Sequence, residues 1–356
     1  MNEGFRRVQV SGTPHECGRQ HGEQLAQQIH VNLAGYWRLF QHKAGLDRAE
    51  VLARSESFLG PIRTFGPHLL DELTGIAEGA GISLIEVVAL NCRTEILSSG
   101  LVPLDGGCTA VFCAPEITAD GHTLMGQNWD WSDHMRGGTV LLRIQQPGRP
   151  VILTLTEAGM VGKIGFNSAG VGVCTNFLRH QVWRPGVPFH LILREMLNAT
   201  RPGLAVAAVY RGARADSGSY MVAHRDGEGL SLEATPKQLG LIHPADGLLV
   251  HTNHFLTSRL QDGDQAILMS DNTLWRYGRA THLLRQQAGK ITPEVIQSVF
   301  RDHFDFPNSI CRHPDPSVHE LERVASLASV VMDLTAGRMW ASAGEPCTAE
   351  YHLNEI

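Results

Sequence analysis

Gly107-Cys108-Thr109 decides the fold, together with Asn128-Trp129-Asp130-Trp131 on the next predicted strand. Cys108 stands behind two glycines at the start of an apolar segment that is typical of a strand. A thiol needs a base to become a nucleophile, and no histidine near Cys108 stands out as that partner. Cleavage of the chain before Cys108 would free an α-amine, which titrates near ~8 and can act as the base. The stretch therefore predicts a cysteine nucleophile at a new N-terminus.

The two glycines before Cys108 favour such a cut. Glycine tolerates the strained backbone that an N-to-S acyl shift requires, because it has no Cβ to clash. The Cys108 thiol would attack the Gly107 carbonyl, and hydrolysis of the resulting ester would free the cysteine amine. The alternative is a buried structural cysteine, which is the ordinary fate of a thiol.

Asp130 is the candidate carboxylate for orienting and charging the new amine. The tryptophans on both sides, Trp129 and Trp131, make its surroundings partly apolar, so that a charge interaction counts for more. The alternative is a solvated turn acid, since Ser132-Asp133 follows directly.

Further candidates lie in the second half of the chain. Asn253 follows the apolar run 248–250, and an amide at a strand end can point its N–H at developing negative charge. A turn asparagine is the more frequent alternative. His251 and His254 are spaced i, i+3 with no HExxH pattern, so the sequence predicts no metal site. Arg312 is either a surface charge or a clamp for a substrate carboxylate.

Composition and charge narrow the class of protein. The 356 residues are 43% hydrophobic and 19% charged, which are globular values. A net charge of -6 without a basic run argues against nucleic acid or a membrane surface as partner. No apolar run reaches the ~18 residues of a membrane span, and the N-terminus has no apolar signal region. The seven scattered cysteines favour reduced thiols in the cytoplasm. No cofactor is expected.

Local patterns predict an α+β chain whose first part is helical. Within residues 1–107, helices are expected after Thr13-Pro14, over 68–80 and from Ser83. The later expected elements are strands at 108–115, 122–130, 151–155 and 170–176, helices at 189–199, 274–287 and after Thr292-Pro293, and strands at 328–334 and 338–342. Asp120-Gly121 is the strongest hairpin signal between the first two strands. This order predicts a layered sandwich.

The chain resembles the acyl-coenzyme A:6-aminopenicillanate acyltransferase family, also called peptidase family C45, of the N-terminal-nucleophile superfamily. The resemblance runs over most of the chain. The segments that carry it are Glu72–Gly81, Leu90–Glu95, Gly107–Thr109, Gly126–Trp131, His251–Phe255, Ser309–Arg312 and Ala328–Asp333. The ordered pair Gly-Cys-Thr and Asn-Trp-Asp is its most specific part.

The resemblance implies a four-layer αββα sandwich with a helical N-terminal segment. It also implies a precursor that cuts itself between Gly107 and Cys108. Residues 1–107 would become the α chain and 108–356 the catalytic β chain, and the two would stay together as one globular unit. The hairpin at Asp120-Gly121 is longer than the resemblance leads us to expect, which bears on the pocket shape.

The resemblance further implies roles for individual residues. Cys108 would be both the nucleophile and, through its α-amine, its own base. Asp130 matches the family's aspartate near that amine, and Asn253 matches the asparagine that stabilises the oxyanion. The remaining candidates, for substrate binding or for assisting the cut, are Arg312, Arg93, Glu95 and Trp129.

The expected function is that of a self-processing cysteine amidohydrolase or acyltransferase. A small acyl amide or acyl thioester would give its acyl group to Cys108, and water or an amine would then take it. The sequence does not choose between the two, because the difference lies in how well the pocket excludes water. One alternative is a hydrolase of small acyl-amine conjugates such as β-alanyl amines. Another is an uncleaved binding or metal-dependent protein on the same fold.

Overall fold

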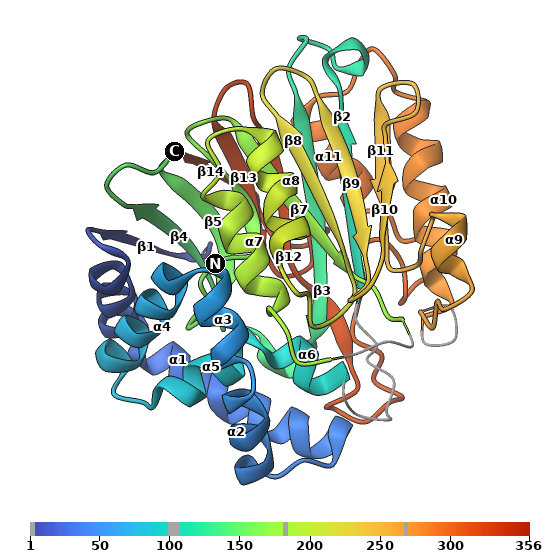
Figure 1. Cartoon of the computed structure of the whole chain (residues 1–356). Helices are drawn as coiled ribbons and strands as arrows, with labels where there is room; N and C mark the ends of the chain where they lie inside the picture. Colours follow the sequence, from blue (N-terminus) through green and yellow to red (C-terminus); the bar gives the residue numbers. More distant parts are fainter. Residues whose placement is uncertain (1–3, 99–106, 181–183, 267–269) are drawn as a thin grey trace.

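Two β-sheets form the centre of the protein (Figure 1). The computed structural model describes residues 4–98, 107–180, 184–266 and 270–356. The eight-stranded sheet contains, in spatial order, β1 (Arg6–Ser11), β4 (Thr139–Gln145), β5 (Ile152–Glu157), β6 (Ile164–Asn167), β7 (Val171–Phe177), β8 (Gly218–His224), β9 (Gly229–Ala234) and β10 (Leu239–Ile242). The six-stranded sheet contains β11 (Leu248–His251), β2 (Gly107–Cys113), β3 (Leu124–Ser132), β12 (Val324–Asp333), β13 (Arg338–Ala343) and β14 (His352–Glu355).

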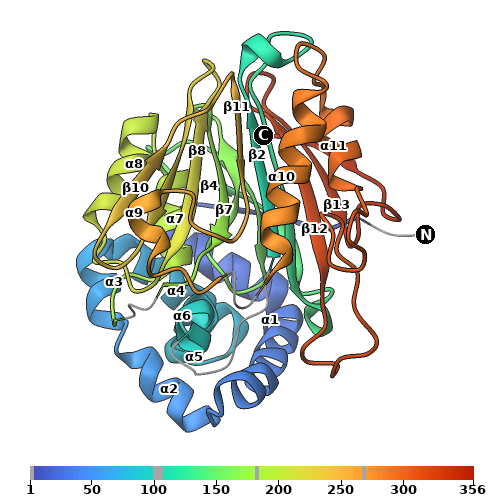
Figure 2. The ribbon, with the colours of Figure 1, turned by 90° about the vertical axis from the view of Figure 1, so that its right-hand side faces the viewer.

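Helices cover the outer face of each sheet, which completes the four predicted layers (Figures 1 and 2). The helices α7 (Phe189–Leu197) and α8 (Pro202–Arg211) pack on the eight-stranded sheet, and α10 (Asn272–Arg285) and α11 (Pro293–Phe300) on the six-stranded one. The short α9 (Ser258–Gln261) precedes α10 in the sequence. The αββα prediction is confirmed.

The two sheets are joined face to face by buried side chains. Gln127 of β3 donates to the carbonyl oxygen of Thr175 in β7 at 2.5 Å, and it accepts from the N–H of Thr175 at 2.8 Å. These bonds replace water on polar groups inside the core, so they fix how β3 lies over β7. The following residues of β3 carry the predicted aspartate.

Six helices lie at one end of the sandwich (Figure 2). They are α1 (Pro14–Ala44), α2 (Arg48–Glu56), α3 (Leu59–Phe65), α4 (Pro67–Ala80), α5 (Leu84–Asn91) and α6 (Arg93–Ser98). The predicted starts at Thr13 and Ser83 are N-caps with complete capping boxes. Helices α1 and α4 touch through their backbones, because a Cβ on Gly75 would lie 2.1 Å from the carbonyl oxygen of His15.

Several elements differ from the expectation. Residues 6–11 form β1, which pairs with β4 in parallel, so the N-terminal segment is not only helical. Only Val8 and Val10 of β1 are buried, and two alternating apolar residues are too few to predict a strand. The hairpin between β2 and β3 is confirmed, but its connection is residues 114–123, with a 3₁₀ turn and a left-handed Gly121 at φ 73°.

Membrane-spanning helices were tested within the described residues. No single helix is long and apolar enough to cross a bilayer, although α4 and α5 together satisfy length and composition across a bend of 117°.

Candidate active site

The backbone of Cys108 is fixed by side chains from three different elements. Its N–H donates to Oδ1 of Asn253 at 2.8 Å. Its carbonyl oxygen accepts from Nη1 of Arg276 at 2.7 Å and from Nδ2 of Asn176 at 3.1 Å. Because both its N–H and its carbonyl oxygen are bound, the backbone of Cys108 is fixed at the start of β2.

Asp130 lies directly opposite the peptide that precedes the cysteine. In the β2–β3 pairing, Gly107 is the partner of Asp130 and Cys108 that of Trp129. A Cβ on Gly107 would come within 2.6 Å of Oδ2 of Asp130, so only glycine leaves room for the carboxylate here. The other carboxylate oxygen accepts from the hydroxyl of Ser326 in β12 at 2.7 Å, which fixes its orientation.

Hydrogen bonds at both ends fix the orientation of the Asn253 side-chain amide. Its Oδ1 accepts from Cys108 and also from Nη2 of Arg276 at 3.0 Å, and its Nδ2 donates to the carbonyl oxygen of Phe177 at 3.0 Å. The amide oxygen therefore faces the cysteine nitrogen, while the N–H donors face away. This geometry holds the backbone nitrogen of Cys108, and the oxyanion role of Asn253 stays a prediction.

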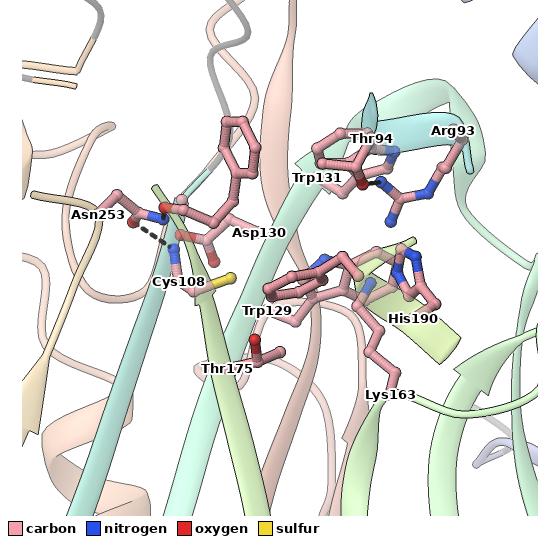
Figure 3. A pocket seen from close by; sticks show the side chains of 13 residues that line it. Arg93, Thr94, Cys108, Trp129, Asp130, Trp131, Lys163, Thr175, His190 and Asn253 are labelled. Carbon is pink, nitrogen blue, oxygen red and sulfur yellow. Dashed lines mark hydrogen bonds between the residues drawn. The ribbon is translucent and has the colours of Figure 1, made fainter. Parts of the chain in front are cut away.

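A small cavity adjoins the thiol (Figure 3). Its volume is about 30 Å³, enough for roughly two water molecules. The Cys108 thiol points toward Trp129 at its edge. The side chains that line it also include those of Asp130, Asn253, Arg93, Lys163, Phe189 and His190. Cys108 is 7% exposed, so little of its surface is accessible to solvent.

The structure separates the four tentative binding residues into two pairs. Arg93 and Trp129 line the cavity. Glu95 is buried behind it, where its Oε1 accepts from the N–H of Phe189 at 2.5 Å, and burial raises the pKa of its carboxyl to about 8. Arg312 is also buried and is not among the lining residues, although its Nη1 lies 3.4 Å from a Cβ built on Gly107. Its role as a substrate clamp stays a prediction.

Burial disfavours the reactive form of the thiol before any cut. Burial first, and then the negative charge of Asp130, raise the pKa of Cys108 to about 11. The positive charge of Lys163 acts in the opposite direction. At neutral pH the thiol is therefore protonated, and it needs a base at hand to become a nucleophile.

Lys163 belongs to a buried group of charges on the far side of the cavity. Its Nζ lies 3.1 Å from the centre of the Trp129 ring and 3.3 Å from Oε2 of Glu157. Arg93 donates to the same oxygen at 2.7 Å and stacks over Trp131 at 4.1 Å. Burial lowers the pKa of Lys163 to about 7, so this ammonium can lose its proton near neutral pH.

Glu157 is expected to be essential for stability, because it is the carboxylate between two buried cations. Burial alone would raise its pKa, but Arg93 and Lys163 lower it to about 2. Glu157→Gln leaves Arg93 buried without its counter-charge, which should cost about 3–5 kcal/mol in urea unfolding at pH 7. The carboxylate contributes above its unfolded pKa, so the difference from wild type should shrink as the pH falls toward 2.

The matched control for this variant is Glu355→Gln. Glu355 pairs with Arg338 on the surface, where 60% and 49% of the side chains are exposed. Water screens such a pair, so its loss should leave the unfolding midpoint almost unchanged. Equal effects of the two variants would contradict the structural role of Glu157.

The two histidines considered as metal ligands have other partners. Nε2 of His251 contacts Oε1 of Glu233 at 2.8 Å, and Nδ1 of His254 contacts the hydroxyl of Thr273 at 3.0 Å. Neither belongs to a group of three or more potential ligands within the described residues. The hydrogen bonds explain why both are buried.

Sequence reasoning missed Arg276, Asn176 and Lys163. Arg276 is fully buried in α10, and Asn176 is in β7. The one sequence signal for Arg276 is its spacing of four and eight residues from Ala280 and Leu284 on one helix face, since arginine is almost never buried without partners. Nothing local to Asn176 or Lys163 points to the cysteine.

Comparison with known proteins identifies the family of the chain. The profile of the family described as acyl-coenzyme A:6-aminopenicillanic acid acyl-transferase matches residues 117–347. The 40 kDa form of acyl-coenzyme A:6-aminopenicillanic-acid-acyltransferase from Emericella nidulans is 34% identical over 343 residues, which cover 95% of this chain and 92% of that protein.

Solved structures with a similar arrangement are more distant. A variant of conjugated bile acid hydrolase from Clostridium perfringens has a TM-score of 0.48 at 13% identity, covering 70% of this chain and 97% of its own. Penicillin V acylase from Agrobacterium tumefaciens has a TM-score of 0.47 at 11% identity, covering 70% and 86%. The family itself is shown by the profile match and by the relative that spans nearly the whole sequence. This chain belongs to the acyl-coenzyme A:6-aminopenicillanic acid acyl-transferase family.

Proposed function

We propose that the chain is a cysteine acyltransferase or amidohydrolase that activates itself by cutting between Gly107 and Cys108. The observation that carries this proposal is the set of contacts that fixes the backbone around Cys108. Its nitrogen is bound to Asn253 at 2.8 Å, and Gly107 pairs with Asp130 across the strands. A nitrogen held in this way is already in place to serve as an α-amine.

The cut itself follows from the groups around the peptide bond. The thiol sulfur attacks the Gly107 carbonyl carbon, the C–N bond breaks, and the thiol proton ends on the departing nitrogen. Water then hydrolyses the thioester and leaves a Gly107 carboxylate and a Cys108 with both thiol and amine. The close approach of Asp130 to Gly107 supports this course, because the carboxylate can stabilise the ammonium as it forms.

Turnover uses the freed amine as the base. The amine of Cys108 takes the thiol proton, the sulfur accepts the acyl group as a thioester, and the amine then assists the acceptor. The relative from Emericella nidulans is named for an acyl-coenzyme A and an amine. We propose the same classes here, an acyl amide or thioester as donor and water or an amine as acceptor.

The two pieces are proposed to remain together after the cut. Segment 1–107 pairs β1 with β4 and sends Asn32 to the carbonyl oxygens of Gly138 and Ala158, both at 3.0 Å. Arg93 reaches Glu157 across the same boundary. These buried contacts outlast the loss of one peptide bond. All seven cysteines are unpaired thiols, which supports a reducing compartment such as the cytoplasm.

The test is the intact mass of freshly purified wild-type protein. Residues 1–107 are 107 of 356, hence roughly 12 kDa of the 39.0 kDa chain, and the remainder is roughly 27 kDa. We expect these two masses, co-eluting in gel filtration, with the larger piece beginning at Cys108. A panel of acyl amides and acyl thioesters then identifies the donor. A stable uncut chain that turns over such substrates would contradict the proposed mechanism.

A further inference from the structure

Four metal-ligating side chains meet at a place that the proposed function does not use. They are His303, Cys311, His313 and Cys347, and each offers one ligand atom within 4.8 Å of the others. The first three lie on the connection between α11 and β12, and Cys347 lies between β13 and β14. Cys311 is buried, His313 and Cys347 are partly buried, and His303 is exposed.

The distances match a tetrahedral metal site. With Zn–N near ~2.05 Å and Zn–S near ~2.3 Å, tetrahedral ligands lie about 3.3 Å apart for N–N and about 3.6 Å for N–S. Nε2 of His313 lies 3.1 Å from Nε2 of His303, 3.3 Å from Sγ of Cys347 and 3.6 Å from Sγ of Cys311. The three distances from Nε2 of His313 therefore agree with the values expected for a tetrahedral site to within about 0.3 Å.

Hydrogen bonding alone does not account for this convergence. Nε2 of His313 carries either one proton or one lone pair, yet three polar atoms surround it. Nε2 can therefore make a good hydrogen bond to at most one of these three atoms. A cation at the centre would accept a lone pair from each of the four ligand atoms at once.

We propose that His303, Cys311, His313 and Cys347 bind one Zn²⁺ ion. Two thiolates and two imidazoles in a tetrahedron form a ligand set that selects zinc among the common cellular cations. Four protein ligands leave no open position for a water or a substrate, so the ion is structural and takes no part in acyl transfer. The spacing in the sequence hides the site, because the fourth ligand comes from another strand connection.

The backbone holds the ligands in place before a metal arrives. The N–H of Cys311 donates to the carbonyl oxygen of Asp302, and that of His313 to Pro307, both at 3.0 Å. Arg301 donates to the carbonyl oxygen of Pro346 at 2.9 Å, which ties the Cys347 segment to the end of α11. Such preorganisation reduces the ordering cost of binding.

The ion would also restrain Asp130 in the candidate active site through Arg312 and Ser326. Cys311 and His313 flank Arg312, whose N–H donates to the hydroxyl of Ser326 at 3.0 Å. That hydroxyl donates in turn to Asp130 at 2.7 Å. Fixing both neighbours of Arg312 thus fixes the group that orients the catalytic carboxylate.

The test is the metal content of the full chain, purified without a chelator and analysed by inductively coupled plasma mass spectrometry. We expect one zinc per chain, and with Co²⁺ in place of zinc a thiolate-to-cobalt charge-transfer band. Cys347→Ser should lose both signals. His303→Ala, at an exposed position, should remain folded and bind zinc at least 10-fold more weakly, as expected for a lost ligand. Cys113→Ala removes a thiol outside the cluster and should keep one zinc.

Two outcomes would overturn the proposal. One is folded wild-type protein that neither contains zinc nor takes up one equivalent of Zn²⁺ or Co²⁺ under reducing conditions. The other is equal zinc binding by wild type, Cys347→Ser and His303→Ala, which would place the ion elsewhere. The metal readouts do not depend on cleavage at Cys108, so they are separate from the test of the proposed function.

Discussion

Cys108→Ala is expected to give a single uncut chain of 39.0 kDa with no detectable acyl transfer or hydrolysis. The variant removes the only atom that can attack the Gly107 carbonyl in the proposed cut, and it removes the acyl acceptor of turnover as well. The methyl side chain fits where the thiol was, so the fold should be retained. The measurements are intact mass after prolonged incubation and activity against the best substrate of the wild-type enzyme.

A matched control lies on the same strand. Cys113 is five residues further along β2 and is also fully buried. Cys113→Ala should be cut and should turn over substrate like the wild type, with only a small loss of stability. Cleavage of Cys108→Ala at the same bond, or residual turnover near wild type, would exclude the cysteine as nucleophile. Cleavage that fails in both variants would indicate a general folding defect.

The parts of this site that were predictable are those that neighbouring strands bring together. The Asp120-Gly121 dipeptide predicts a hairpin, and the hairpin places Asp130 beside Gly107. Asn253 follows β11, which pairs with β2, so it reaches the cysteine from the next strand. Strand pairing alone therefore assembles the predicted core of the site.

The parts that were not predictable depend on packing between layers. Arg276 reaches Cys108 from α10, and Asn176 reaches it from the opposite sheet. Neither distance can be derived from local periodicity, because helix placement and sheet stacking are set by side-chain packing. The orientation of the Asn253 amide has the same origin, since Arg276 determines which end faces the cysteine.

Asp130→Asn is expected to slow both the cut and the turnover by on the order of 10²–10⁴-fold. The carboxylate lies opposite Gly107, the residue before the proposed amine, and the Ser326 hydroxyl donates to it at 2.7 Å. An amide of the same shape keeps the packing but gives up the charge that stabilises the forming ammonium. The cut can be followed by intact mass over time, and turnover by kcat and KM, of which kcat should carry the loss.

The same variant should make the thiol easier to ionise while the enzyme becomes slower. Asp130 adds to the effect of burial in raising the pKa of Cys108, so its neutralisation should lower that pKa. Iodoacetamide should therefore modify Cys108 faster in the uncut variant than in wild-type precursor sampled before the cut is complete, between pH 8 and 10, with Cys113 still protected. Modification of both thiols would reveal unfolding, and unchanged turnover would remove Asp130 from the mechanism. Asp133→Asn, three residues away and partly exposed, is the control that should alter neither rate. Faster alkylation together with slower catalysis would indicate that the aspartate promotes the reaction through the amine, because its charge opposes ionisation of the thiol.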